Sequence, residues 1–206
     1  MGSPSLKNLY IRAAKKLKKD GEYNMSTKVH HDLHFRSDVL RFIENPNGVG
    51  VELGVAEGSF SEQILRAFEG QHFYLYSIDM WAGDRGHNVD EYRRTILRLD
   101  PWKRNNTIIK MTFDEAAPLF PNDSLDFVYV DGYAHTGEND GKYFRDWYPK
   151  LKEGGIIAGD DYHPDWPLVV SAVNAFRREI DRELNIIPNM AKVDRWSMFP
   201  TWFMQK

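Results

Sequence analysis

The chain alternates short apolar runs with segments in which apolar residues recur at helical spacing. From residue 49 onward, each run that fits a strand is followed by a pattern that fits a helix. Strands are expected at 49–53, 73–78, 107–110, 125–130 and 155–158, and helices at 59–68, 91–99, 114–119, 141–148 and 168–184. This alternation is typical of an α/β fold with a doubly wound parallel sheet. Such sheets bind ligands outside the carboxyl ends of their strands.

The segment before residue 48 has a different pattern. Its first ~20 residues read as a basic amphipathic helix that is solvated on one face. A second helix is expected from Ser37, a suitable N-cap, to Glu44. We therefore divide the chain into an N-terminal helical cap or lid segment, 1–47, and one domain, 48–206.

Composition narrows the class of protein. The chain has 206 residues and a formal net charge of −3, so nucleic acid is not expected as a partner. The lack of cysteine excludes disulfides and thiolate metal sites. No apolar run approaches the ~20 residues that a membrane span needs, and the N-terminus lacks the apolar core of a signal peptide. We expect a cytoplasmic protein without a membrane partner.

A glycine turn follows the first strand of the domain. Gly54 and Gly58 lie between that strand and the helix that opens at Ser59, so backbone N–H groups there can cradle a polar ligand. A dinucleotide site would need glycine where Ala56 stands, and Glu57 would repel a pyrophosphate. A ligand without phosphate fits better, and an NAD-dependent Rossmann-type enzyme is the alternative.

The next two strands end in residues suited to a nucleoside. Asp79, at the end of the second strand, can accept hydrogen bonds from both hydroxyls of a ribose. Thr112 and Phe113 follow the third strand and by position would flank an adenine. Trp81 could stack on the same base. Phe113 and Trp81 could equally belong to the core.

Three carboxylates follow the fourth and fifth strands. Asp131 ends one strand, and Asp160 and Asp161 end the next, and adjacent strands lie roughly 5 Å apart. Like charges this close need a positive partner, and no Lys or Arg lies beside them in sequence. Clustered carboxylate oxygens suit Mg²⁺, Mn²⁺ or Ca²⁺. The alternative is that one or two of the aspartates are caps or turn residues.

The motifs together resemble a known family. The spacing Glu52-x-Gly54-x-x-x-Gly58 is similar to the first motif of class I S-adenosylmethionine-dependent methyltransferases. The stretches IDMWAGD, VDGYAHT and DWYPKLKEGGIIAGDD look like those of the small metal-dependent sugar O-methyltransferases of antibiotic biosynthesis, in the same order. The resemblance begins at about residue 38.

The resemblance implies a fold and a set of site residues. The fold would be a single Rossmann-like, seven-stranded sheet, mostly parallel, with a C-terminal antiparallel hairpin of Asn185–Ile187 and Thr201–Met204, its first strand held to the sheet edge by Pro188. The metal would bind Asp131, Asp160 and Asp161, with Mg²⁺ preferred, and His135 would lie nearby. The cofactor would contact Glu52, Gly54, Gly58, Ser59, Phe60, Asp79, Met80, Trp81, Thr112, Phe113 and Asp131.

The implied reaction is divalent-metal-assisted O-methylation of a small hydroxylated acceptor such as a sugar. A neutral hydroxyl must lose its proton as the new bond forms, and Asp131 or His135 could take it. An alternative function stays open, that of a catalytically idle module that keeps the cofactor site. Separately, the aromatic C-terminal segment could belong to the core or form the contact of a homo-oligomer.

Overall fold

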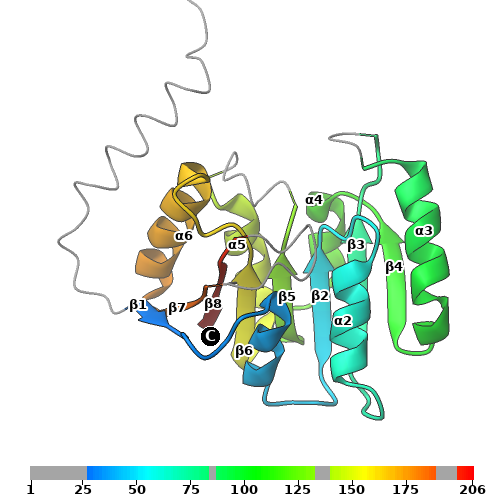
Figure 1. The fold of residues 1–206 in the computed structure, drawn as a ribbon, viewed down its shortest axis with the longest axis horizontal. Helices are drawn as coiled ribbons and strands as arrows, with labels where there is room; N and C mark the ends of the chain where they lie inside the picture. Colours follow the sequence, from blue (N-terminus) through cyan, green and yellow to red (C-terminus); the bar gives the residue numbers. More distant parts are fainter. Residues whose placement is uncertain (1–26, 84–86, 133–139, 189–198) are drawn as a thin grey trace, which may run out of the picture.

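The computed structural model describes residues 27–83, 87–132, 140–188 and 199–206. These residues form one eight-stranded sheet in the order β1-β7-β8-β6-β5-β2-β3-β4 (Figure 1). The strands are β1 (Thr27–Val29), β2 (Val49–Leu53), β3 (Tyr74–Asp79), β4 (Asn106–Lys110), β5 (Leu125–Val130), β6 (Leu151–Gly159), β7 (Leu184–Ile187) and β8 (Thr201–Gln205). All neighbours pair in parallel except β8, which is antiparallel to β6 and to β7.

Helices cover both faces of the sheet. They are α2 (Ser59–Ala67), α3 (Val89–Leu99), α4 (Phe113–Ala116), α5 (Lys142–Trp147) and α6 (Pro167–Ile180), with 3-10 turns η1 (Arg36–Phe42), η2 (Asp100–Trp102), η3 (Ala117–Leu119) and η5 (Tyr148–Lys150). Side chains alternate along β5, so that Val128 faces one apolar cluster and Phe127 the other.

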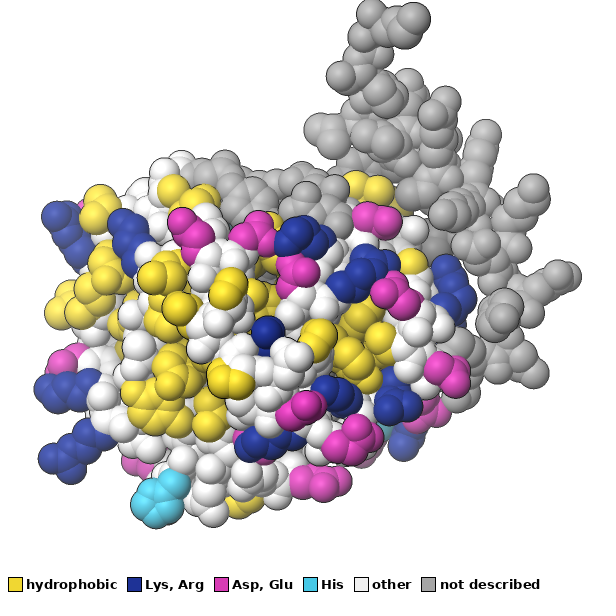
Figure 2. All heavy atoms as spheres, turned by 180° about the vertical axis from the view of Figure 1, so that it is seen from behind, with side chains coloured by type: hydrophobic (Ala, Val, Ile, Leu, Met, Phe, Trp, Pro, Cys, Tyr) yellow, Lys and Arg dark blue, Asp and Glu magenta, His cyan; other side chains and the backbone are white. Residues whose placement is uncertain are grey.

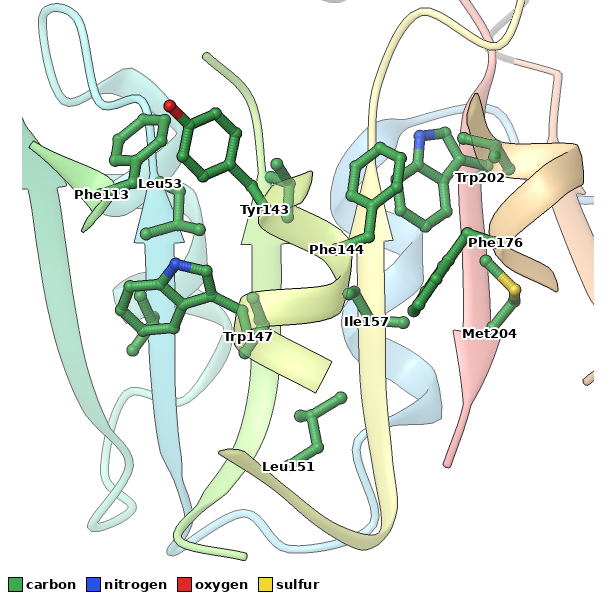
Figure 3. Packing of buried hydrophobic residues seen from close by; sticks show 14 of the residues in the cluster. Leu53, Phe113, Tyr143, Phe144, Trp147, Leu151, Ile157, Phe176, Trp202 and Met204 are labelled. Atoms are coloured by element: carbon green, nitrogen blue, oxygen red, sulfur yellow. The ribbon is translucent and has the colours of Figure 1, made fainter. Parts of the chain in front are cut away.

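One cluster includes side chains from α4, α5 and α6, and the other includes side chains from η1, α2 and α3. In the first, Phe144 and Trp202 meet edge to face at 4.9 Å between ring centroids (Figure 3). The fully buried Trp147 lies apart from this pair in the same cluster, with its ring centroid 5.2 Å from that of Phe120. From behind, Lys and Arg side chains lie among Asp and Glu around a more apolar middle, with no large field of one sign (Figure 2).

The predicted mostly parallel sheet with an antiparallel C-terminal hairpin is confirmed. The strand count is one more than expected, because β1 comes from the segment predicted to be helical and pairs in parallel with β7. The edge position predicted for β7 is therefore wrong. Pro188 follows the last residue of β7, so the ladder does not need the N–H that proline lacks.

Residues 1–26, which carry the predicted basic helix, lie outside the described residues, and the division into a cap segment and a domain stays a prediction. The second predicted helix of that segment is present as the 3-10 turn η1. Within the described ranges, no helix is both long and apolar enough to cross a membrane.

Candidate functional site

The register of the parallel strands brings the predicted site residues to one edge of the sheet. Leu53 pairs with Ile78 on one side and with Val130 on the other, and Val130 pairs with Gly159. The residues that follow these strands therefore emerge side by side. This is the carboxyl edge of β2, β3, β5 and β6, as the alternation of the sequence predicted.

The glycine at the start of the turn is required by the protein itself. Gly54 has φ +96°, and a Cβ there would lie 1.2 Å from the carbonyl oxygen of Asp131. Gly58 has φ +76° and precedes α2 as its N-cap. The group that leaves no room for a side chain at Gly54 is thus the end of β5, which packs directly against the turn.

Asp79 stabilises this turn through hydrogen bonds to its backbone. Its Oδ2 accepts hydrogen bonds from the backbone N–H groups of Val55 and Ala56, at 2.9 and 3.0 Å, and its Oδ1 accepts one from Trp81 at 3.0 Å. A carboxylate has about four lone-pair positions, so these donors leave room for about one more. The contact of Asp79 with both ribose hydroxyls stays a prediction. Because two hydroxyls need two acceptor positions, one of them would have to share a position with a backbone N–H.

Trp81 packs against the same turn. It is 2% exposed, its Nε1–H donates to the carbonyl of Ala56 at 2.8 Å, and its ring lies 4.7 Å from that of Tyr92. Thr95, from α3, donates to the same carbonyl at 2.7 Å. Trp81 therefore has a structural task in the turn, and stacking on an adenine is an additional role that stays predicted.

Glu52 is a buried acid with one oxygen engaged and one not. The Ser61 hydroxyl donates to its Oε2, Ser77 donates to Ser61 at 3.1 Å, and Asn106 donates to Ser77 at 2.9 Å. Oε1 has no hydrogen-bond partner among the described residues. Burial, chiefly, raises the pKa of Glu52 from 4.5 to about 8. A buried carboxyl group in this state would be stabilised in its ionised form by a ligand that brings a donor or a positive charge.

The acids after β5 and β6 meet a cation that the sequence did not reveal. The Nη1 of Arg36 lies 3.3 Å from Oδ2 of Asp131 and 3.5 Å from Oδ2 of Asp160. Arg36 belongs to η1, and its side chain is 3% exposed. It is 95 and 124 positions away from its two partners along the chain. Arg36 is therefore not visible among the sequence neighbours of the two aspartates.

The third acid is electrostatically part of the same cluster. Burial, followed by the charges of Asp131 and Asp160, raises the pKa of Asp161 to about 8. Burial, followed by Asp131, raises that of Asp160 to about 6, although Thr201 donates to its Oδ1 at 2.7 Å. The three carboxylates thus influence one another electrostatically, and their joint ligation of a metal stays a prediction. The part of the chain that the structure describes holds no group of three or more acidic or histidine side chains arranged for a metal ion.

Residues 51–162 match the model of a protein family described as a methyltransferase domain. This segment runs from β2 to just past β6 and makes up more than half of the chain. The chain belongs to this methyltransferase family. Its fold is the one that the motifs predicted.

The methyltransferase resembles several solved structures over most of its length. The O-methyltransferase NovP is 22% identical, with a TM-score of 0.56 over 82% of this chain and 79% of that one. The precorrin-6y C5,15-methyltransferase of Geobacter metallireducens GS-15 is 16% identical, with a TM-score of 0.59 over 90% and 93%. Cofactor-bound Rv0187 from MTB is 12% identical, with a TM-score of 0.59 over 98% and 92%. At these identities the likeness shows the fold.

A curated relative of the methyltransferase matches only in part. The uncharacterized protein y4gI of Sinorhizobium fredii (strain NBRC 101917 / NGR234) is 26% identical over 91 residues, which are 42% of this chain and 10% of that protein. The chain thus corresponds to about a tenth of that relative, and the match carries nothing about substrates.

The remaining predicted cofactor contacts of the methyltransferase lie along the same edge. Thr112 caps α4 and accepts from the Glu115 N–H at 3.2 Å, and the buried Phe113 meets Tyr143 edge to face at 5.3 Å. Phe113 also limits Gly132, where a Cβ would come within 2.7 Å of its ring.

Three further predicted contacts lie at the same edge: the partly buried Met80 follows β3, and Ser59 and Phe60 are the first two residues of α2. His135 lies outside the described residues.

Proposed function

We propose that this methyltransferase transfers a methyl group to an oxygen of a small hydroxylated acceptor such as a sugar. The observation that carries the proposal is the cluster of acids after β5 and β6, which lies beside the glycine turn and includes Asp131 with a side chain 27% exposed. A partly exposed carboxylate next to the cofactor corner can receive a proton from a bound hydroxyl. The stretches of the sequence that resemble those of sugar O-methyltransferases support the same class of acceptor.

The cofactor fits the residues of the first corner. S-adenosylmethionine carries a positive sulfonium and an ammonium, and the unpartnered Oε1 of Glu52 offers a buried acceptor for positive charge or an N–H donor. Glu57, which counts against a pyrophosphate, does not oppose such a cation. When bound, the cofactor supplies an electrophilic methyl group that passes in line to the acceptor oxygen.

The chain's own residues would then orient the acceptor and move a proton. Asp131 would take the hydroxyl proton as the acceptor oxygen uses its electron pair to bind the methyl carbon, while the bond from that carbon to the cofactor sulfur would break with its electron pair left on the sulfur. His135 is the alternative base. Because in-line transfer requires the acceptor oxygen to be aligned with the methyl group, most of the rate acceleration would come from holding the two reactants in that orientation.

The predicted magnesium site does not fit the residues as they stand. One oxygen of Asp131 and one of Asp160 already face the guanidinium of Arg36, and the other oxygen of Asp160 accepts from Thr201. We therefore derive no step through a metal, and Mg²⁺ dependence of the proposed reaction is an outcome of the experiments below.

The proposed function is tested by binding and transfer with the whole chain. We expect S-adenosylhomocysteine to bind in calorimetry and NAD not to bind. Methyl transfer from labelled S-adenosylmethionine is then measured against sugars and catechols, with Asp131→Asn as the variant that removes the base. Transfer to a sugar hydroxyl that falls at least 10-fold in Asp131→Asn supports the proposal. Cofactor binding without transfer to either acceptor class favours the idle module.

A further inference from the structure

Arg36 is a buried cation that lies between the start of α2 and the acids after β5 and β6. Its Nη1 faces Asp131 and Asp160, and its Nη2 lies 3.5 Å from the Ser59 hydroxyl. Its guanidinium carbon stands 4.4 Å from the centre of the Phe60 ring. The side chain therefore contacts the start of α2 on one side and the ends of β5 and β6 on the other.

The position of Arg36 is set by its own segment as well as by the aspartates. The Asp38 carboxylate accepts from the backbone N–H groups of His34 and Phe35, at 2.9 and 3.0 Å, and so fixes the entry to η1. Val39 and Leu40 anchor the turn in the core, at 0% and 6% exposure. The backbone of η1 is thus held by packing, and this directs Arg36 inward.

A guanidinium in this position supplies what a divalent ion would supply to the same atoms. Asp131 and Asp160 repel each other, and a positive group between them offsets that repulsion. Arg36 donates toward one oxygen of each, as an ion would bridge them. An Mg²⁺ ion would need those oxygens at about 2.0–2.1 Å, and it would then face a fixed, permanently charged guanidinium at close range.

We propose that Arg36 is a built-in cation that replaces a divalent ion at Asp131 and Asp160, so that the site excludes metal and works without it. Arg36 acts as a positioning residue: it holds the carboxylate of Asp131 oriented toward the cofactor corner. The part concerning turnover rests on the proposed function. The part concerning metal exclusion does not.

The test measures Mn²⁺ binding to the full chain by calorimetry and electron paramagnetic resonance. The variants are Arg36→Met and Arg36→Gln, which remove the charge, and Arg36→Lys, which keeps it. Arg41→Met is the matched control, because Arg41 lies on the same turn with a side chain 69% exposed. We expect millimolar or weaker Mn²⁺ affinity for wild type, Arg36→Lys and Arg41→Met, and at least 100-fold tighter binding for Arg36→Met and Arg36→Gln.

Two results would overturn the inference. One is micromolar Mn²⁺ binding by the wild-type chain that disappears in Asp160→Asn. The other is folded Arg36→Met or Arg36→Gln that binds Mn²⁺ no better than wild type. If neither neutral variant folds, wild-type turnover decides: a rate unchanged by EDTA supports the inference, and a rate abolished by EDTA and restored by Mg²⁺ contradicts it. Binding of S-adenosylhomocysteine, measured in parallel, reports separately on the proposed function.

Discussion

Replacing Glu52 by glutamine should make the protein more stable at alkaline pH and weaken its hold on the cofactor. Glutamine keeps the shape of the side chain and can still accept from Ser61, but it cannot ionise. In the wild-type chain the buried carboxyl has a pKa of about 8 instead of 4.5, so it stays protonated in the fold while the unfolded chain releases its proton. The stability that comes from the neutral acid is complete below pH 4.5 and is lost as pH rises toward 8.

The size of the effect follows from the two pKa values. Between 4.5 and about 8 each pH unit removes about 1.4 kcal/mol of the free energy of unfolding, so Glu52 alone accounts for a loss on the order of 4–5 kcal/mol. Between pH 5 and pH 8 the advantage of Glu52→Gln over wild type should therefore grow by about 3–4 kcal/mol, because the unfolded group is already mostly ionised at pH 5 and the folded group is half ionised at pH 8. Asp160 and Asp161 titrate in both proteins, so their contributions cancel in the difference.

The assay is urea unfolding of both proteins at pH 5, 6, 7 and 8. The free energy of unfolding of wild type should fall relative to that of Glu52→Gln across this series. Calorimetry of S-adenosylhomocysteine at pH 7 in buffers of different ionisation enthalpy gives a second readout. Wild type should release close to one proton on binding, whereas Glu52→Gln should release none and bind at least 10-fold more weakly.

The reasoning about Glu52 has a clear point of failure. If the stability difference between wild type and Glu52→Gln stays constant from pH 5 to pH 8, the carboxyl is not neutral in the fold. Serine-to-alanine replacement at Ser61 is the control for the hydrogen bond alone. It should lower stability by about 1 kcal/mol below pH 6, where the carboxyl is neutral in both proteins.

Three further changes test the fold that carries the site. Gly54→Ala should prevent folding or abolish the cooperative melt, because its Cβ would overlap the carbonyl of Asp131; a native melting temperature would contradict this. Trp147→Ala, which empties a fully buried site, should cost about 3–5 kcal/mol in urea unfolding, and a cost below 1 would contradict it. Thr201→Val should cost about 1–2 kcal/mol by removing the donor to Asp160, and an unchanged urea midpoint would contradict this.

The sequence was sufficient for most of the helices and strands and for the edge of the sheet at which the site residues lie. Strands and helices show their period within a few residues, so the runs at 49–53 and 125–130 were predicted with the bounds of β2 and β5. In a parallel sheet the strand ends share one edge, so the meeting of Asp131 with Asp160 also followed. The pairing of β1 with β7 did not, because three residues at 27–29 are too short to show a period.

The partners of these residues were decided only by the tertiary structure. The cation among the acids is Arg36, brought from 95 positions away by the packing of η1, and nothing in its sequence neighbourhood signals that. Gly54 is required by the backbone of Asp131, and Asp79, which was predicted to bind ribose hydroxyls, accepts hydrogen bonds from amides of the glycine turn. Local patterns report which backbone a segment adopts. Contacts between distant segments depend on how whole elements pack, and that information is not contained in any one stretch of the chain.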